Sequence, residues 1–150
     1  MDDMDRTLLS ELQRDADRSL SDLGQIVGLS ASAVQRRLAR LKASGTITAI
    51  VAQLDPVRLG LPVTIVTTVR FERDSNVRTQ ALVDQLRNRP EVVLLHSLAG
   101  PYDLLIVTRV GELADYTEGV LSDLEADDNV ARLETNVSLG LLKATHALPL

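Results

Sequence analysis

Cysteine is absent from the 150 residues of this chain, and histidine occurs only twice, as His96 and His146. The absence of cysteine excludes a disulfide scaffold and a cysteine-rich zinc site. The two histidines have no triad partners or metal-ligand spacing around them, and the apolar stretch around His96 favours a structural role. We therefore expect neither a metal nor a cofactor.

Long apolar runs are also absent. No stretch approaches the roughly 18 consecutive apolar residues that a membrane-spanning helix needs. The N-terminus is acidic, unlike the basic start of a secretory signal. We expect a cytoplasmic protein that does not enter a membrane.

Acidic and basic residues are divided unevenly along the chain, whose net charge is −5. Residues 1–54 hold seven acids and seven bases, so residues 55–150 carry the whole negative excess. Because salt screens charges beyond about 10 Å, local charge decides whether a region can bind an anion. The length and the compositional difference indicate two small domains.

Residues 20–47 have the pattern of two short helices joined by a tight turn. Ser19 and Asp22 form a capping pair that predicts the start of the first helix, and Ser30 can cap the second. Glycine adopts the left-handed conformation that ends a helix. The glycines that predict the two helix ends are Gly28 and Gly45.

The second of these helices separates apolar from basic residues. At about 100° per residue, Val34, Leu38 and Leu41 form one apolar stripe. A basic face can be no more than a solvated surface, but a short helix, a turn and a longer basic helix make a helix-turn-helix, whose second helix enters the major groove of DNA. The candidate DNA-binding residues are Ser30, Ser32, Gln35, Arg36, Arg37, Arg40 and Lys42.

These candidates divide into two roles. Arg36 lies opposite the apolar stripe, so we predict that it reaches base edges, assisted by Ser32 and Gln35. The remaining cations are predicted to hold phosphates, and these are Arg37, Arg40 and Lys42.

A further helix and a hairpin complete the predicted N-terminal domain. Asp3–Asp15 predicts a helix whose acidic start complements the helix dipole. Thr46–Leu54 is rich in Ile, Val and Thr and predicts a short strand pair, so residues 1–54 would form a winged helix-turn-helix. Residues 55–62 contain two prolines and a glycine and predict the linker.

Residues 63–150 predict the ferredoxin-like order β-α-β-β-α-β, which gives an α+β fold class. A helix at 92–98 is disfavoured because the segment is short and flanked by proline and glycine. The expected strands are 63–71, 92–98, 104–107 and 130–142, and the expected helices are 77–89 and 113–124.

The two strands expected in the middle of this order are apolar on both faces. Two helices cover only one face of the sheet, and no further segment remains to cover the other. We therefore predict a homodimer that packs sheet against sheet, which also supplies two helix-turn-helix units for two half-sites. The alternative is an exposed apolar surface, which would favour aggregation. The residues predicted to share one face are Val93, Leu95, Leu105 and Val107.

Several short segments, taken in their order and spacing, resemble the Lrp/AsnC (leucine-responsive/asparagine-type) family of prokaryotic transcription regulators. In the first half these include Asp5-Arg6-Thr7-Leu8-Leu9, Val27-Gly28-Leu29-Ser30 and Gly45-Thr46-Ile47. In the second half they are Ala99-Gly100-Pro101-Tyr102-Asp103-Leu104-Leu105 and Glu134-Thr135. The resemblance covers nearly all of the chain.

The resemblance implies a C-terminal domain that binds an amino acid or related metabolite at a subunit interface, in dimers that assemble further into tetramers or octamers. Gly100 would adopt a backbone geometry that a side chain would strain, and Asp103 could pair with an ammonium group. Alternatively, Gly100-Pro101 is only a turn that Asp103 caps. The implied effector-binding residues are Gly100, Tyr102, Asp103, Thr135 and Asn136.

The predicted architecture also resembles that of the siroheme decarboxylases, which provide an enzymatic alternative. The scarcity of catalytic groups and the basic helix argue against it. A second alternative is an oligomerising protein whose DNA-binding domain has lost its function, but Arg36 and Arg40 argue against that reading. We predict a DNA-binding regulator and not an enzyme.

Overall fold

The computed structural model describes residues 1–72 and 76–150, with the side chains of residues 76–78 left undescribed. The chain folds into two compact units. The first contains Met1–Gln53 together with Leu142–Leu150, and the second is Leu54–Leu141. Among the described residues, no helix is both long enough and apolar enough to cross a membrane.

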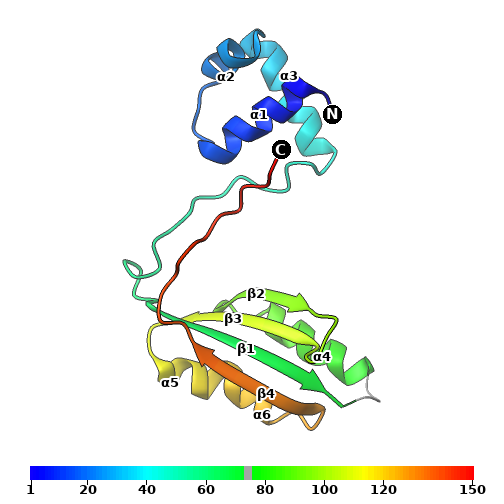
Figure 1. The fold of residues 1–150 in the computed structure, drawn as a ribbon, viewed down its shortest axis with the longest axis vertical. Coiled ribbons are helices and arrows are strands. Elements are labelled where there is room, and N and C mark those ends of the chain that lie inside the picture. The colour runs from blue at the N-terminus through cyan, green and yellow to red at the C-terminus, as the bar shows by residue number, and fades with distance from the viewer. Residues whose placement is uncertain (73–75) are drawn as a thin grey trace. The chain divides into compact units, whose positions relative to one another are not determined.

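Three helices form the first unit: α1 (Asp3–Arg14), α2 (Leu20–Val27) and α3 (Ala31–Ala43) (Figure 1). The predicted caps are confirmed, because the Ser19 hydroxyl accepts from the backbone of Asp22 and the Ser30 hydroxyl accepts from that of Ala33. Both predicted terminal glycines have a positive φ, which an L side chain would strain. The apolar faces of the three helices meet in one core formed by Leu8, Leu9, Leu23, Val34, Leu38 and Leu41.

The tight packing between α2 and α3 depends on Gly24. A Cβ atom at this position would collide with the backbone carbonyl oxygen of Leu29, in the turn that joins the two helices. The amide of Leu29 donates to the Gly24 carbonyl over 2.9 Å. The turn therefore folds back against α2 at a distance that only glycine permits.

The predicted strand pair at Thr46–Leu54 is wrong. None of these residues lies in a strand, and residues 48–54 form no backbone hydrogen bond with the described part of the chain. The segment contains no proline, asparagine or aspartate and no glycine after Gly45. A hairpin needs such residues to reverse the chain, so the unit is a helix-turn-helix without a wing of its own.

The second unit has the predicted α+β order. Its strands pair antiparallel in the order β2-β3-β1-β4 (Figure 1). The last strand ends at residue 137, earlier than predicted, and the second helical region contains a π-helical turn. The elements are β1 (Val63–Phe71), α4 (Asn76–Arg87), β2 (Val92–Ser97), β3 (Leu104–Val110), α5 (Leu113–Tyr116), η1 (Thr117–Leu121), α6 (Ser122–Glu125) and β4 (Val130–Val137).

Both helical regions of this unit pack on one face of the sheet. Leu82 and Leu86 of α4 share a single core with Tyr116, Val120 and Leu124 of the α5–α6 region. Alternate residues of the two central strands complete that core, and these are Ile65, Val69, Phe71, Leu104, Ile106 and Val110. The opposite face, which we call the open face, has no helix from the described part of the chain packed on it.

The open face is apolar at its centre, but its residues differ from the predicted set. A register shift between Val92 and Leu94 turns Leu95 toward the helices, where it packs against the core. Its grouping with Leu105 and Val107 is therefore wrong, because strict alternation ignores the bulge. Leu94, which is 40% exposed, pairs with Val107 instead. The apolar residues of the open face are Val66, Leu94, Leu105 and Val107.

Candidate functional site

The exposed surface of α3 carries the residues predicted to read DNA bases. Ser32, Gln35 and Arg36 are all exposed, while Val34 is fully buried and Leu38 is nearly so. The hydroxyl groups of Ser30 and Ser32 lie 3.1 Å apart at the start of the helix. Ser30 therefore has a structural role as the helix cap, and its hydroxyl lies on the same exposed edge as Ser32.

The four cations of α3 have two different environments. Arg36 and Lys42 are exposed and form no ion pair within the described part of the chain. Arg37 and Arg40 instead contact the first turn of α1. The three predicted phosphate ligands, Arg37, Arg40 and Lys42, therefore do not share one environment.

A carboxylate at the start of α1 joins these two arginines. Asp5 is only 1% exposed. One of its oxygens accepts from Nη1 of Arg37 over 2.8 Å, and the other accepts from Nη2 of Arg40 over 2.9 Å. Asp2 adds a contact of 2.7 Å to the same nitrogen of Arg37. We call these four residues, Asp2, Asp5, Arg37 and Arg40, the N-terminal ion-pair cluster.

Protonation of both carboxylates in this cluster is disfavoured. Burial by itself raises the pKa of Asp5, but hydrogen bonds from Arg37 and from the backbone of Asp2 outweigh it, so this pKa lies below its usual value. The hydrogen bond from Arg37 also lowers the pKa of Asp2. The pKa of Arg37 is raised by the same contacts. All three groups are therefore charged at neutral pH.

The acidic start of α1, which includes Asp5, was predicted only to complement the helix dipole, and the contacts of Asp5 with α3 were not predicted. Its backbone N–H and side chain also form a reciprocal capping box with Asp2, with bonds of 2.8 and 3.2 Å. One signal was present in the sequence. Asp2 and Asp5 are spaced by one turn, as are Arg37 and Arg40, so each pair lies on one face of its helix.

In the second unit, Asp103 joins the predicted effector loop to the end of β1. Its carboxylate accepts from the backbone N–H of Phe71 over 2.8 Å, next to the register shift between Arg70 and Phe71. Its own N–H donates to the Val69 carbonyl, and its carbonyl accepts from Leu98, each over 2.8 Å. The Asp103 carboxylate thus caps an irregular end of β1, and only its backbone carbonyl closes the turn that contains Gly100-Pro101.

The expectation of a strained backbone at Gly100 is wrong. Its φ lies outside the left-handed region, and a Cβ atom added there would meet no heavy atom within 4 Å. The turn leaves open space on this side, so its geometry does not require glycine within the single chain.

Tyr102 lies beside a pair of opposite charges from β4. Its ring centre is 6.0 Å from the Arg132 guanidinium, and Arg132 donates to Glu134 over 2.6 Å. The interaction with the Glu134 carboxylate, together with desolvation, raises the pKa of Tyr102. Because Leu133 packs into the core, Arg132 and Glu134 lie on the open face.

The remaining predicted effector residues, Thr135 and Asn136, point to opposite faces of the sheet. The Thr135 hydroxyl lies 2.9 Å from that of Tyr116, which lies 2.8 Å from that of Thr67 in the core. Asn136 pairs with Val66 on the other face. The five candidates therefore do not line one pocket within the single chain.

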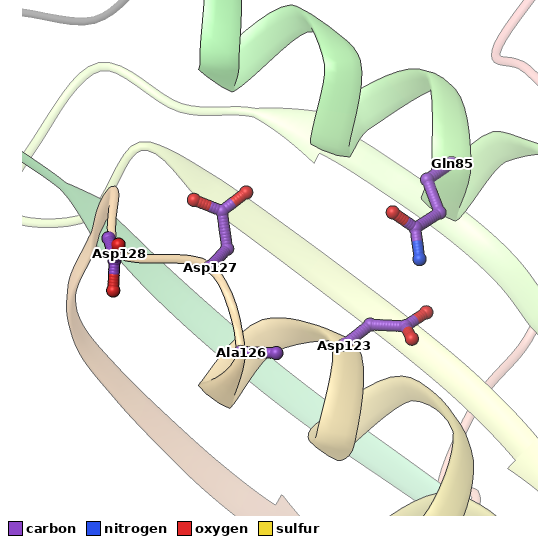
Figure 2. Close-up of a pocket in the computed structure, with 5 residues that line it drawn as sticks. All are labelled: Gln85, Asp123, Ala126, Asp127 and Asp128. Atoms are coloured by element: carbon purple, nitrogen blue, oxygen red, sulfur yellow. The ribbon is translucent and has the colours of Figure 1, made fainter.

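A shallow hollow of about 320 Å³ lies elsewhere, between α4 and the turn after α6 (Figure 2). Its lining is acidic, and two of its carboxylates already have partners: Asp123 accepts from Arg89 over 2.6 Å, and Asp127 accepts from the backbone of Asn129 over 2.9 Å. None of the predicted effector residues lines it. The lining residues are Gln85, Asp123, Ala126, Asp127 and Asp128.

Metal ligands are not clustered in the described part of the chain, where no group of three or more His, Asp or Glu side chains is placed to hold an ion. The two surfaces described above are suited to binding: a basic and hydroxyl-bearing helix surface in one unit, and an apolar sheet face with polar edges in the other.

A helix-turn-helix joined to an α+β unit with an open sheet face defines a class of DNA-binding regulators that carry their own sensor domain. Comparison with protein families agrees. The family model for the AsnC-type helix-turn-helix domain matches residues 1–42, and that for the Lrp/AsnC ligand binding domain matches residues 64–148. The chain belongs to the Lrp/AsnC family of DNA-binding transcriptional regulators.

Named relatives match over the whole chain. The glutamate uptake regulatory protein of Zymomonas mobilis is 31% identical over 150 residues, which is 100% of this chain and 91% of the relative. The DNA-binding transcriptional activator DecR of Escherichia coli is 29% identical over 100% of this chain and 99% of the relative.

Solved structures of related proteins share the fold. An AsnC family transcriptional regulator from Agrobacterium tumefaciens has a TM-score of 0.90 and 28% identity, covering 99% of this chain and 97% of that one. A transcriptional regulator from Neisseria meningitidis, solved as an L-Met complex, has a TM-score of 0.91 and 26% identity, covering 99% and 96%.

The N-terminal ion-pair cluster predicts how the first unit responds to acid. Since the folded pKa values of Asp2 and Asp5 lie below their unfolded values, their stabilisation is present above the ordinary aspartate pKa of about 4 and is lost as the pH falls through the folded values. Unfolding followed by circular dichroism between neutral and acidic pH should show this loss. Asp5→Asn should flatten the acid dependence, whereas Asp3→Asn, which changes an exposed acid outside the cluster, should retain it. An equal slope in Asp5→Asn and wild type would contradict the assignment.

Proposed function

We propose that this regulator binds DNA sequence-specifically as a homodimer and that an amino acid or related metabolite bound at a subunit interface modulates its binding. The observation that carries the proposal is Arg36, which is exposed and has no ion-pair partner among the described residues. It lies beside Ser32 and Gln35 on a helix whose two ends are capped and whose opposite side is buried. Such a helix presents donors in a fixed direction, as base recognition in the major groove requires.

The sequence predicted three phosphate ligands, Arg37, Arg40 and Lys42, and of these we assign contacts with the DNA backbone to Lys42 and Arg40. Lys42 is exposed and lies outside the N-terminal ion-pair cluster, so it can hold a phosphate. Arg40 is 63% exposed although it pairs with Asp5, which leaves it free to contact a phosphate on its outer side. Ser30 and Ser32 add hydroxyl groups at the N-terminus of α3, where the helix dipole favours anions.

The occupant that we propose for the open face is a second copy of this chain. Val107 pairs with Leu94 on one side and Val66 on the other, and Leu105 lies two residues before it in the same strand; among the described residues no layer covers them. Sheet-on-sheet packing buries such a surface, and a two-fold axis supplies an identical partner. Dimerisation also brings two recognition helices to two half-sites, which one helix-turn-helix cannot contact.

The proposed effector site is completed by other subunits. In one chain, Gly100, Tyr102, Asp103, Thr135 and Asn136 do not enclose a pocket, so a second dimer would have to close it in a tetramer or octamer. Arg132 and Glu134 beside Tyr102 present both charges that a zwitterionic amino acid needs. The L-Met complex of the Neisseria regulator and the name of the Zymomonas regulator support an amino acid or a related compound.

We do not propose an enzymatic activity. The relatives named above are called transcriptional regulators, and the recognition surface of α3 would have no role in a tetrapyrrole-modifying enzyme of the same architecture.

Binding to a short duplex selected from random-sequence DNA by the wild-type protein tests the base-reading role. Arg36→Ala should weaken binding to this duplex by about 1–3 kcal/mol and relax its sequence preference, because a bidentate base contact is lost. Lys42→Ala should weaken selected and scrambled duplexes alike and reduce the salt dependence. Unchanged affinity of Arg36→Ala for the selected duplex would show that α3 presents a different face to DNA.

Sedimentation or light scattering tests the dimer. Val107→Asp places a charge at the centre of the open face and should raise the dimer dissociation constant by more than about a hundredfold, because an unpaired buried charge is costly. Leu113→Asp is the matched control, since Leu113 is 49% exposed at the start of α5 and lies off the open face. A wild-type protein that stays monomeric at micromolar concentration would rule out this assembly.

Calorimetry with the common amino acids tests the effector loop and separates its two interpretations. In Asp103→Asn an amide oxygen can still accept from the N–H of Phe71, so the fold should keep its stability while a charge partner for an ammonium is lost. We expect amino-acid affinity to fall about tenfold or more and basal DNA binding to remain. Equal amino-acid affinity in Asp103→Asn and wild type would place the site elsewhere.

A further inference from the structure

The N-terminal ion-pair cluster lies at the only place where charged side chains join α1 to α3 in the described part of the first unit. Arg37 is 24% exposed, compared with 63% for Arg40. Three nitrogen–oxygen contacts of 2.7 to 2.9 Å hold the two arginines to α1. Distances in this range are those of charge-assisted hydrogen bonds, which are stronger than neutral ones.

Helix geometry places Arg37 apart from the base-reading residues. At about 100° per residue, Arg37 lies about 60° from Val34, close to the apolar stripe, whereas Arg36 lies on the far side of the helix. The Arg37 side chain therefore leaves α3 beside its buried stripe and reaches the start of α1, away from the exposed side that carries Arg36. Its guanidinium is already bound by two carboxylates, Asp2 and Asp5.

We propose that Asp5 is a positioning residue for DNA recognition, which fixes the rotation of α3 through Arg37 and Arg40 and thereby the direction in which Arg36 points. Arg37 is then part of this anchor and contacts no phosphate. The inference rests on the proposed DNA-binding role of α3 and gives the cluster a function beyond the stability of the unit.

The ion-pair cluster resists rotation of α3 more strongly than the apolar contacts of the helix do. The contacts of Val34, Leu38 and Leu41 are apolar, and apolar contacts resist separation more than they resist small rotations or shifts. A buried carboxylate behaves differently, because losing a partner leaves a desolvated charge unpaired. Rotation of α3 would pull both arginines away from Asp5 together, so the cluster selects one orientation of the helix.

The direction in which Asp5→Asn changes DNA affinity separates a positioning role from simple electrostatics. Asp5 is an acid next to a DNA-binding surface, and removing it frees two cations. If the cluster only withheld phosphate ligands, Asp5→Asn would strengthen binding to every sequence and steepen the salt dependence. If the cluster positions α3, Asp5→Asn lowers affinity for the preferred sequence even though the protein becomes less negative.

The experiment measures binding of the full chain to the selected duplex and to a scrambled duplex of the same composition, over a series of salt concentrations. We expect Asp5→Asn to lower the ratio of selected to scrambled affinity about tenfold, the loss expected for one misdirected base contact. Asp5→Glu, which restores the charge, should recover most of this ratio. Asp3→Asn is the matched control, because it removes an exposed acid from the same helical turn and should leave the ratio unchanged.

Arg37→Gln tests the proposal without changing Asp5. A purely structural role would not change the affinity ratio and the salt slope in the same way. We expect a reduced ratio with an unchanged salt slope, since no phosphate contact is lost, whereas Lys42→Gln should reduce the slope by about 0.9 and leave the ratio unchanged. A reduced slope in Arg37→Gln, or tighter binding of both duplexes by Asp5→Asn, would overturn the proposal. Failure of the wild-type protein to prefer any duplex would instead refute the proposed function.

Discussion

A buried carboxylate cannot stay charged without partners, and the DNA-binding unit is built around the way in which Asp5 meets this requirement. It has three partners: the backbone N–H of Asp2 at the start of α1, and two arginines one turn apart on α3. The same contacts cap the first helix and hold the recognition helix. Cap, core and recognition surface are therefore coupled, because Val34 and Leu38 bury one side of α3 while Asp5 fixes its rotation.

The second unit obeys a different constraint, which is the number of layers around a sheet. One core includes residues of both helical regions, so the described part of the chain covers only one face of the sheet. The uncovered centre, with Leu105 and Val107 in one strand and Leu94 in the next, is too apolar to favour solvent. The proposed dimer would cover this face, and the proposed effector loop at the end of the sheet would then lie next to the interface.

Local patterns in the sequence were sufficient to predict the helices, their caps and the strand order, because each depends on residues close in the chain. Ser19, Ser30 and the terminal glycines act within one turn, and alternation identified the central strands. Predictions failed where geometry depended on distant partners or irregular backbone. Leu95 changed face because of a bulge, the strand pair at 46–54 lacked a turn, and Asp5 meets Arg37 across more than thirty residues.

The predicted sites show the same difference between features set by residues close in the chain and features set by distant partners. Exposure of Arg36 followed from helix periodicity alone, but periodicity could not distinguish it from Arg40, whose environment depends on α1. Asp5 and Asp103 both lie in segments that carry the family resemblance, and both carboxylates have partners within the chain: arginines in one case and the N–H of Phe71 in the other. Such motif residues mark the frame that orients a binding surface. The proposed roles of the two anchors differ: Asp5 would orient the exposed Arg36 without itself contacting DNA, whereas Asp103 orders a strand end and would also meet the effector beside Tyr102.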